Sequence, residues 1–351
     1  MREQSKNFLE KLIVTPSPSG NEVEVQKIWM DYVKDFAHKI ETDVVGNVMA
    51  SVNPDKPFKV MLAGHSDEIA FMVNHIDSDG YIYVSKAGGI NPKLALGMRV
   101  RVLGKNGVLK GVVGVKAEHQ GGASDKIKAK DIFIDCGAAN KEEITKHVSI
   151  GDYVIYDVDY EYMLNDNFAG RALDNRTGAF IVAEVLRRVA DKDPNVAVYA
   201  VSTVNEETNM GGAYFAASHI KPTMGIACDV TFGTDYPGID SRESGNVELG
   251  KGPVLSKGAP INDKINTLLE KAAEDNEISI QYELTPRATG TDADKIRLTG
   301  TGVPVALVSL PLRYMHSPSE VVNIKDIENE IELLVQTILS MSGNENLKPL
   351  E

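Results

Sequence analysis

A histidine and an aspartate follow a short apolar run near the start of the chain. Residues 60–63 are apolar, Gly64 comes next, and His65-Ser66-Asp67 follow. If the backbone stays extended here, His65 and Asp67 lie on the same face, because side chains alternate along a strand. A carboxylate next to an imidazole fixes the orientation of the ring, an arrangement that is common at metal sites. Taken alone, the pair is better explained as a strand-end histidine and a surface aspartate.

Three more predicted buried strands are followed by side chains of the same kinds. Glu206 and Glu207 come after the apolar run 196–204, Asp229 after 224–228, and His316 after 303–310. Ligands of an open α/β sheet gather beyond the carboxyl ends of its strands, so these side chains are expected to meet. Asp174 differs because it opens a predicted helix, where a carboxylate can also act as a cap.

Two imidazoles and three carboxylates from this set would suit zinc, cobalt or manganese. Calcium and magnesium prefer shells made only of oxygen. The set is too large for one catalytic zinc with three protein ligands, and it suits two ions about 3.5–4 Å apart that share a bridging carboxylate. Of the adjacent glutamates, one would coordinate an ion and the other would take a proton from the attacking water.

The segments around these residues predict an α/β layer structure. Helical periodicity appears at 8–13, 23–36, 173–189, 261–273, 292–298 and 324–341, with strands between them. Residues 44–52 are predicted to be a strand interrupted by a turn, and 303–310 to be the last strand. Ser19 and Glu22 have the spacing of a capping box for the second helix.

The stretch from about 71 to 162 has a different texture. Short β-branched and apolar runs alternate there with glycine-containing turns, and no long helical period appears. We therefore expect a small β-barrel of residues 70–163 inserted into an α/β domain made of residues 1–69 and 164–351. A length of 351 residues is consistent with two domains.

The composition excludes several classes of function. A net charge of −13 argues against sequence-independent binding to nucleic acid or to anionic membranes. Cys136 and Cys228 are the two cysteines, so we expect a reducing compartment without a disulfide framework. The first residues lack an apolar signal core, and no apolar run reaches the roughly 20 residues of a membrane span. We expect a cytoplasmic protein.

The motifs together resemble those of a known enzyme family. The chain resembles the tetrahedral, or glutamyl, aminopeptidase family of dinuclear metallopeptidases, whose members are also labelled endoglucanase M or cellulase M. Matching motifs extend from Pro18 to His316. They are Pro-Ser-Gly-Asn-Glu at 18–22, Gly-His-Ser-Asp-Glu-Ile at 64–69, Ala-Leu-Asp-Asn-Arg at 172–176, Glu-Glu at 206–207, Cys-Asp at 228–229 and Arg-Tyr-Met-His-Ser-Pro at 313–318.

The resemblance implies a role for each candidate residue. It implies a three-layer α/β/α metallopeptidase domain in which His65 and Asp229 bind one ion and Asp174 bridges both. Glu207 and His316 would complete the second ion's site, Asp67 would orient His65, and Glu206 would be the general base. The resemblance also implies dimerisation through residues 70–163 and assembly of six dimers into a dodecamer. Asn209, Gly211 and Ala70 depart from the family's usual residues.

The function predicted from the sequence is therefore removal of N-terminal residues from peptides by a two-metal enzyme. A glycosidase built on the paired glutamates is one alternative, but it leaves His65, Asp174 and His316 without a role. A protein in which the ions only stabilise an assembly is the other. In that case Glu206 would be a buried carboxylate without a function.

Overall fold

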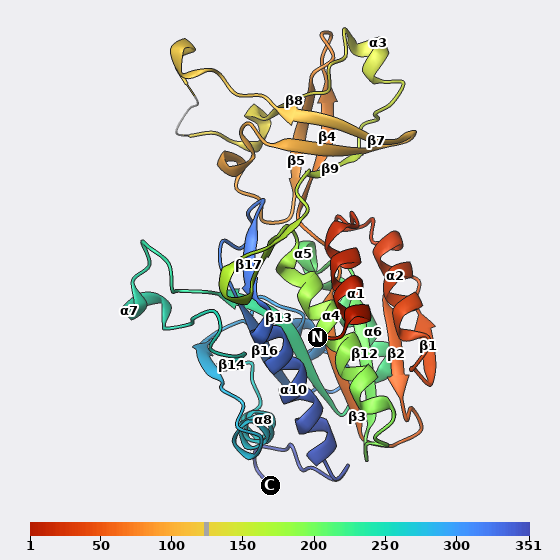
Figure 1. The fold of residues 1–351 in the computed structure, drawn as a ribbon. Helices are drawn as coiled ribbons and strands as arrows, with labels where there is room; N and C mark the ends of the chain where they lie inside the picture. Colours follow the sequence, from red (N-terminus) through yellow and green to blue (C-terminus); the bar gives the residue numbers. More distant parts are fainter. Residues whose placement is uncertain (123–125) are drawn as a thin grey trace.

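The computed structural model describes residues 1–122 and 126–351 as an α/β body that carries a β-barrel at one end (Figure 1). Within these residues, an eight-stranded sheet has the order β1-β2-β12-β3-β13-β16-β14-β15. Its strands are β1 (Lys39–Thr42), β2 (Val48–Val52), β3 (Lys59–His65), β12 (Ala197–Thr203), β13 (Met224–Phe232), β14 (Val254–Lys257), β15 (Gln281–Leu284) and β16 (Val305–Leu312).

The four central strands of this sheet are parallel. β12 and β13 flank β3, and β16 lies beside β13, all in the same direction. Every residue of β12 is buried, which suits an apolar run covered on both faces. β2 and β14 lie outside this group and run antiparallel to it. The carboxyl ends of β3, β12, β13 and β16 therefore meet at one edge of the sheet.

Helices cover both faces of the sheet, which confirms the predicted three-layer arrangement. Val60 and Leu62 of β3 pack into the larger core cluster, whereas Met61 and Ala63 pack into a second cluster on the opposite face. The larger cluster includes α1 (Glu3–Val14), α2 (Val23–Val33), α4 (Leu173–Ala190), α8 (Asp263–Asp275) and α10 (Ile324–Ser340), and the second includes α6 (Gly211–Ile220) and α9 (Ala293–Ile296).

Helix α4 approaches β3 unusually closely near its amino-terminal end. A Cβ atom added to Gly64 would lie 2.3 Å from the backbone carbon of Gly178, so the contact leaves no space for a side chain. Glycine at these positions lets backbone meet backbone. The start of α4, with Asp174, is thereby held against the end of β3, with His65.

The barrel forms directly after β3 and confirms the predicted β-structure of this region. It closes in the order β4-β5-β8-β7-β6-β9 around its own apolar core. The division into two domains at 69/70 and 163/164 stays a prediction. The barrel strands are β4 (Ala70–Ile76), β5 (Ile82–Ala87), β6 (Arg99–Gly104), β7 (Gly107–Val113), β8 (Phe133–Asp135) and β9 (Tyr153–Tyr156), and α3 (Lys141–Ile144) precedes the last of them.

Three expectations about individual elements were wrong. Residues 44–47 form a turn between β1 and β2, because Asp43 accepts hydrogen bonds from the backbone N–H groups there. β13 does not end before Asp229 but continues to Phe232. β16 is not the last strand, because β17 (Glu320–Asn323) follows it and pairs with β11 (Asn167–Gly170), which pairs with β10 (Tyr160–Tyr162).

In the described part of the chain, no helix has the length and apolar character needed to cross a membrane.

Candidate metal centre

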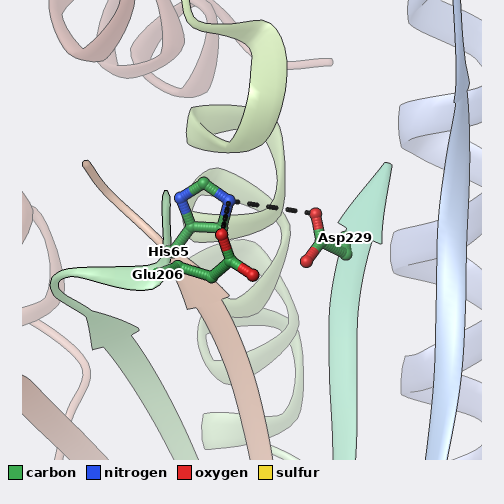
Figure 2. A group of neighbouring side chains, drawn as sticks. All are labelled: His65, Glu206 and Asp229. Carbon is green, nitrogen blue, oxygen red and sulfur yellow. Dashed lines mark ion pairs between the residues drawn. The ribbon is translucent and has the colours of Figure 1, made fainter. Parts of the chain in front are cut away.

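Side chains from β3, from β13 and from the segment after β12 meet near the carboxyl edge of the sheet (Figure 2). His65 is the last residue of β3, Asp229 lies on β13, and Glu206 opens the short helix α5 (Glu206–Asn209) that follows β12. The Nε2 atom of His65 lies 3.7 Å from Oε2 of Glu206 and 3.9 Å from Oδ1 of Asp229. The structure therefore brings these predicted residues together around one imidazole.

Asp174 connects this group to a second one. Its Oδ1 atom lies 3.2 Å from Nε2 of His65, and its Oδ2 atom lies 3.3 Å from Nε2 of His316. Oε2 of Glu207 is 3.4 Å from the same nitrogen of His316. The backbone at Asp174 is not helical, with φ −77° and ψ 107°, although the residue lies in the first turn of α4. One carboxylate thus faces two imidazoles through two different oxygens.

The centre is buried and carries more acids than bases. His65 is 1 % exposed and Glu206 8 % exposed. Burial raises the pKa of the Glu206 carboxyl to about 10, and the negative charges of Asp229 and Asp292 add to this rise against the opposing His65. Burial and the charge of Asp174 likewise raise the pKa of Glu207. Added positive charge would stabilise such a cluster of carboxylates.

At the two imidazoles and at Asp174, the neighbouring groups favour the charged form, which raises the pKa of each imidazole and lowers that of Asp174. Burial alone would lower the pKa of His65, but the neighbouring carboxylates, Glu206 first, raise it well above its usual value. Burial alone would raise the pKa of Asp174, but hydrogen bonds with His316 and His65 hold it below its usual range. Asp174 is therefore the carboxyl in this centre that stays ionised most readily.

Asp67 contacts both His65 and the turn that carries the two glutamates. Its Oδ1 atom lies 3.3 Å from Nδ1 of His65. The same carboxylate accepts backbone N–H bonds from Glu206 at 3.0 Å and Glu207 at 3.1 Å. Ser19 does not cap α2 as expected, because its hydroxyl donates to Asp67 at 2.7 Å instead. One carboxylate thus lies against His65 and accepts hydrogen bonds from the turn that carries both glutamates.

Glu320 and Gly89 hold the second half of the centre, and the sequence analysis missed both. The carboxylate of Glu320 accepts the backbone N–H of Asp174 at 3.1 Å and that of His316 at 2.8 Å. Nδ1 of His316 lies 3.2 Å from the carbonyl oxygen of Gly89, which belongs to the loop after β5 of the barrel. The position of Glu320, four residues after His316, was a weak sequence signal for a contact between them. No sequence pattern pointed to Gly89.

Asp292 is a further buried acid beside the centre. Thr203 donates its hydroxyl to Oδ2 of Asp292 at 2.5 Å, and Thr203 is the register partner of His65. Burial raises the pKa of Asp292 to about 6, against the opposing charge of His65. The sequence analysis placed this residue in a helix but gave it no chemistry. Its helix, α9, is shorter than predicted and starts at Ala293.

The donor atoms fit divalent cations. His65, Glu206 and Asp229 offer atoms within 4.8 Å of one another, and so do His65, Asp174 and Glu207. Oε1 of Glu207 is buried without a hydrogen-bond partner. Coordination to a cation would compensate for the missing hydrogen bond. A cavity of about 790 Å³ lies at the opposite edge of the sheet, against Ile261 and Val305, and does not include these donors.

Comparisons with known proteins match this chain over most of its length. The family model described as M42 glutamyl aminopeptidase matches residues 46–333. The lysyl aminopeptidase of Pyrococcus furiosus is 35 % identical over 355 residues, covering 98 % of each chain. The TET aminopeptidase from the marine sediment archaeon Thaumarchaeota archaeon SCGC AB-539-E09 is 29 % identical, covers 97 % of each chain and has a TM-score of 0.91. The PhTET1-12s structure, with a dodecamer in its asymmetric unit, is 27 % identical, with a TM-score of 0.86 over 97 % of this chain and 100 % of that one.

Proposed function

Because this chain belongs to the M42 glutamyl aminopeptidase family, we propose that it removes N-terminal residues from peptides through a two-metal centre with a glutamate base. The family assignment makes the chain a peptide hydrolase of the aminopeptidase type. The observation that carries the metal proposal is Asp174, which faces His65 and His316 through separate oxygens. A carboxylate in this position suits the bridge of a two-ion site.

The proposed ligands divide into two sets around Asp174. His65 and Asp229 would hold one divalent ion, and Glu207 and His316 would hold the other. Zinc or cobalt suits this mixture of nitrogen and oxygen donors, and manganese is also compatible. When bound, such ions polarise the scissile carbonyl and lower the pKa of a water molecule. Donor atoms of Glu206, His65 and Asp229 lie within 4.8 Å of one another, which supports a role for Glu206 beside the ion that His65 and Asp229 would hold.

Glu206 would act as the general base of the reaction. Its carboxylate would take a proton from the attacking water and give it to the amine that leaves. Burial and neighbouring acids raise the pKa of this carboxyl, and bound cations would oppose that rise by favouring the ionised form, which is the form that accepts a proton. Asp67 positions this base through the N–H bond that it accepts from the Glu206 backbone. The backbone hydrogen bond to Asp67 would therefore hold the proposed base, Glu206, in position for the proton transfer.

A panel of aminoacyl-anilides tests this function. Protein stripped with a chelator is expected to lose activity and to regain it when zinc, cobalt or manganese is returned. Turnover of each anilide is the measurement. A metal-free protein that hydrolyses a cellulose derivative would instead support the glycosidase. A protein that holds both ions and cleaves no aminoacyl substrate would support the assembly role.

Self-association is the second part of the proposal. We infer dimers formed through residues 70–163 and a dodecamer built from them, because a similar structure contains a dodecamer. Light scattering coupled to size-exclusion chromatography is expected to give the mass of twelve chains of 38.1 kDa. A chain that elutes as a monomer at micromolar concentration would contradict this proposal without affecting the proposed chemistry.

A further inference from the structure

Three consecutive backbone N–H groups at the start of α5 donate to buried carboxylates. The N–H of Asn205 donates to Oε1 of Glu22 at 3.1 Å, and those of Glu206 and Glu207 donate to Asp67. Successive N–H groups form a concave site for an anion where a left-handed residue adjoins right-handed ones. Asn205 is left-handed, with φ 59° and ψ 30°, and α5 follows it. Two acids therefore hold the turn that carries the proposed base.

Glu22 is the acid that holds the left-handed residue of this turn. Its side chain is 6 % exposed, and its Oε1 atom also accepts the N–H of Gly20 at 2.8 Å. Burial raises the pKa of Glu22 to about 7, although the N–H groups of Gly20 and Asn205 oppose this rise. A left-handed residue other than glycine persists only where its surroundings hold it. The bond from Asn205 to Glu22 supplies such a hold.

The barrel in turn supports the loop before Glu22. The hydroxyl of Tyr153 on β9 donates to the carbonyl oxygen of Ser19 at 2.8 Å. A Cβ atom added to Gly20 would lie 2.8 Å from the same hydroxyl oxygen, and the φ of Gly20 is 91°, so glycine is required there. The hydroxyl of Ser19 donates to Asp67. The loop, the barrel and both acids thus form one connected set of contacts behind the turn.

From this geometry we propose that Glu22 is a positioning residue for Glu206, the proposed general base. The inference rests on the proposed function, because it assumes that Glu206 takes the proton of the attacking water. Asp67 holds the N–H groups of residues 206 and 207, and Glu22 holds the residue before them. Together the two acids set the direction in which the chain enters α5, and with it the position of the Glu206 carboxylate.

The substitution Glu22→Met tests this role, because it removes the acceptor and retains a side chain of similar length. We expect kcat to fall about 10- to 100-fold, since a displacement of about 1 Å at a catalytic group can cost about 10²-fold. KM should stay within about twofold of the wild-type value, because substrate binding is not affected. Glu22→Gln keeps an oxygen acceptor for the N–H of Asn205 and should recover most of kcat.

A double-mutant cycle with Glu206→Gln shows whether Glu22 acts through the base. If it does, Glu22→Met lowers kcat in the wild type but not in Glu206→Gln, where the base is already absent. An equal loss in both backgrounds overturns the inference, and so does a Glu22→Met variant with wild-type kcat or with one ion lost. Glu22→Asp, whose shorter side chain withdraws the acceptor, answers the same question if Glu22→Met does not fold.

Asp77→Leu is the matched control for the loss of an acid that holds a turn. Oδ1 of Asp77 likewise accepts two backbone N–H groups, those of Asp79 and Tyr81, between β4 and β5. β5 runs from that turn toward the loop that contacts His316, so the turn lies at the opposite end of the strand. The control should leave kcat unchanged, and a loss as large as that of Glu22→Met overturns the inference. A wild type that cleaves no aminoacyl-anilide overturns the proposed function instead.

Discussion

Replacing Glu206 with glutamine is expected to abolish peptide hydrolysis while leaving the metal content unchanged. Glutamine has nearly the same shape, and its amide cannot accept the proton of the attacking water. Removal of a general base typically lowers kcat by about 10²- to 10⁴-fold. The backbone bond from residue 206 to Asp67 should survive, because it does not involve the side chain. Turnover of an aminoacyl-anilide and elemental analysis of the same sample measure both quantities.

Glu142→Gln is a suitable control, because Glu142 is an exposed acid on α3 of the barrel. It should retain wild-type turnover. If Glu206→Gln keeps more than about a third of the wild-type rate, Glu206 is not the base. If it loses one ion instead, Glu206 is a ligand, as its position beside His65 and Asp229 also permits.

Replacing Asp174 with asparagine is expected to remove both ions and to reduce turnover by about 10³-fold or more. The variant loses the charge that faces His65 and His316, and its amide nitrogen cannot coordinate a cation. Charge stabilisation by the metal is worth several kcal/mol, and each 1.4 kcal/mol corresponds to a factor of ten in rate. Elemental analysis should show fewer than one ion per chain.

Asp240→Asn tests whether loss of any acid has this effect, because Asp240 is exposed beside the short helix α7 (Ser241–Ser244). It should bind metal normally. An Asp174→Asn variant that still binds both ions would show that the carboxylate does not bridge them. Restored binding at high metal concentration, with turnover still absent, would show that Asp174 acts mainly on the position of the ions.

The strand-borne residues of the site could be predicted because their signal is local. Apolar runs before His65, Glu206 and His316 are long enough to be recognised as buried strands, and the parallel order of those strands brings their ends together. Asp229 was located for the same reason, although its strand continues three residues further. Hydrophobic patterning thus determines which side chains meet.

The residues that fix the orientation of these side chains could not be predicted. Ser19 has the spacing of a helix cap, but its hydroxyl donates instead to the carboxylate of Asp67, which is distant in the sequence. Glu320 acts through the backbone N–H groups of Asp174 and His316, which leave no pattern in the side chains. These contacts depend on tertiary pairing, which periodicity does not encode.

The contact between Gly89 and His316 joins the barrel to the candidate metal centre. The carbonyl oxygen of Gly89 lies 3.2 Å from Nδ1 of His316. A Cβ atom added to this glycine would lie 2.5 Å from the same nitrogen, so the contact leaves no space for a side chain. Deleting residues 70–163 would remove none of the proposed metal ligands from the sequence. It would, however, remove the carbonyl oxygen of Gly89, which lies against Nδ1 of His316. An α/β body without the barrel would therefore need another acceptor for the Nδ1 atom of His316.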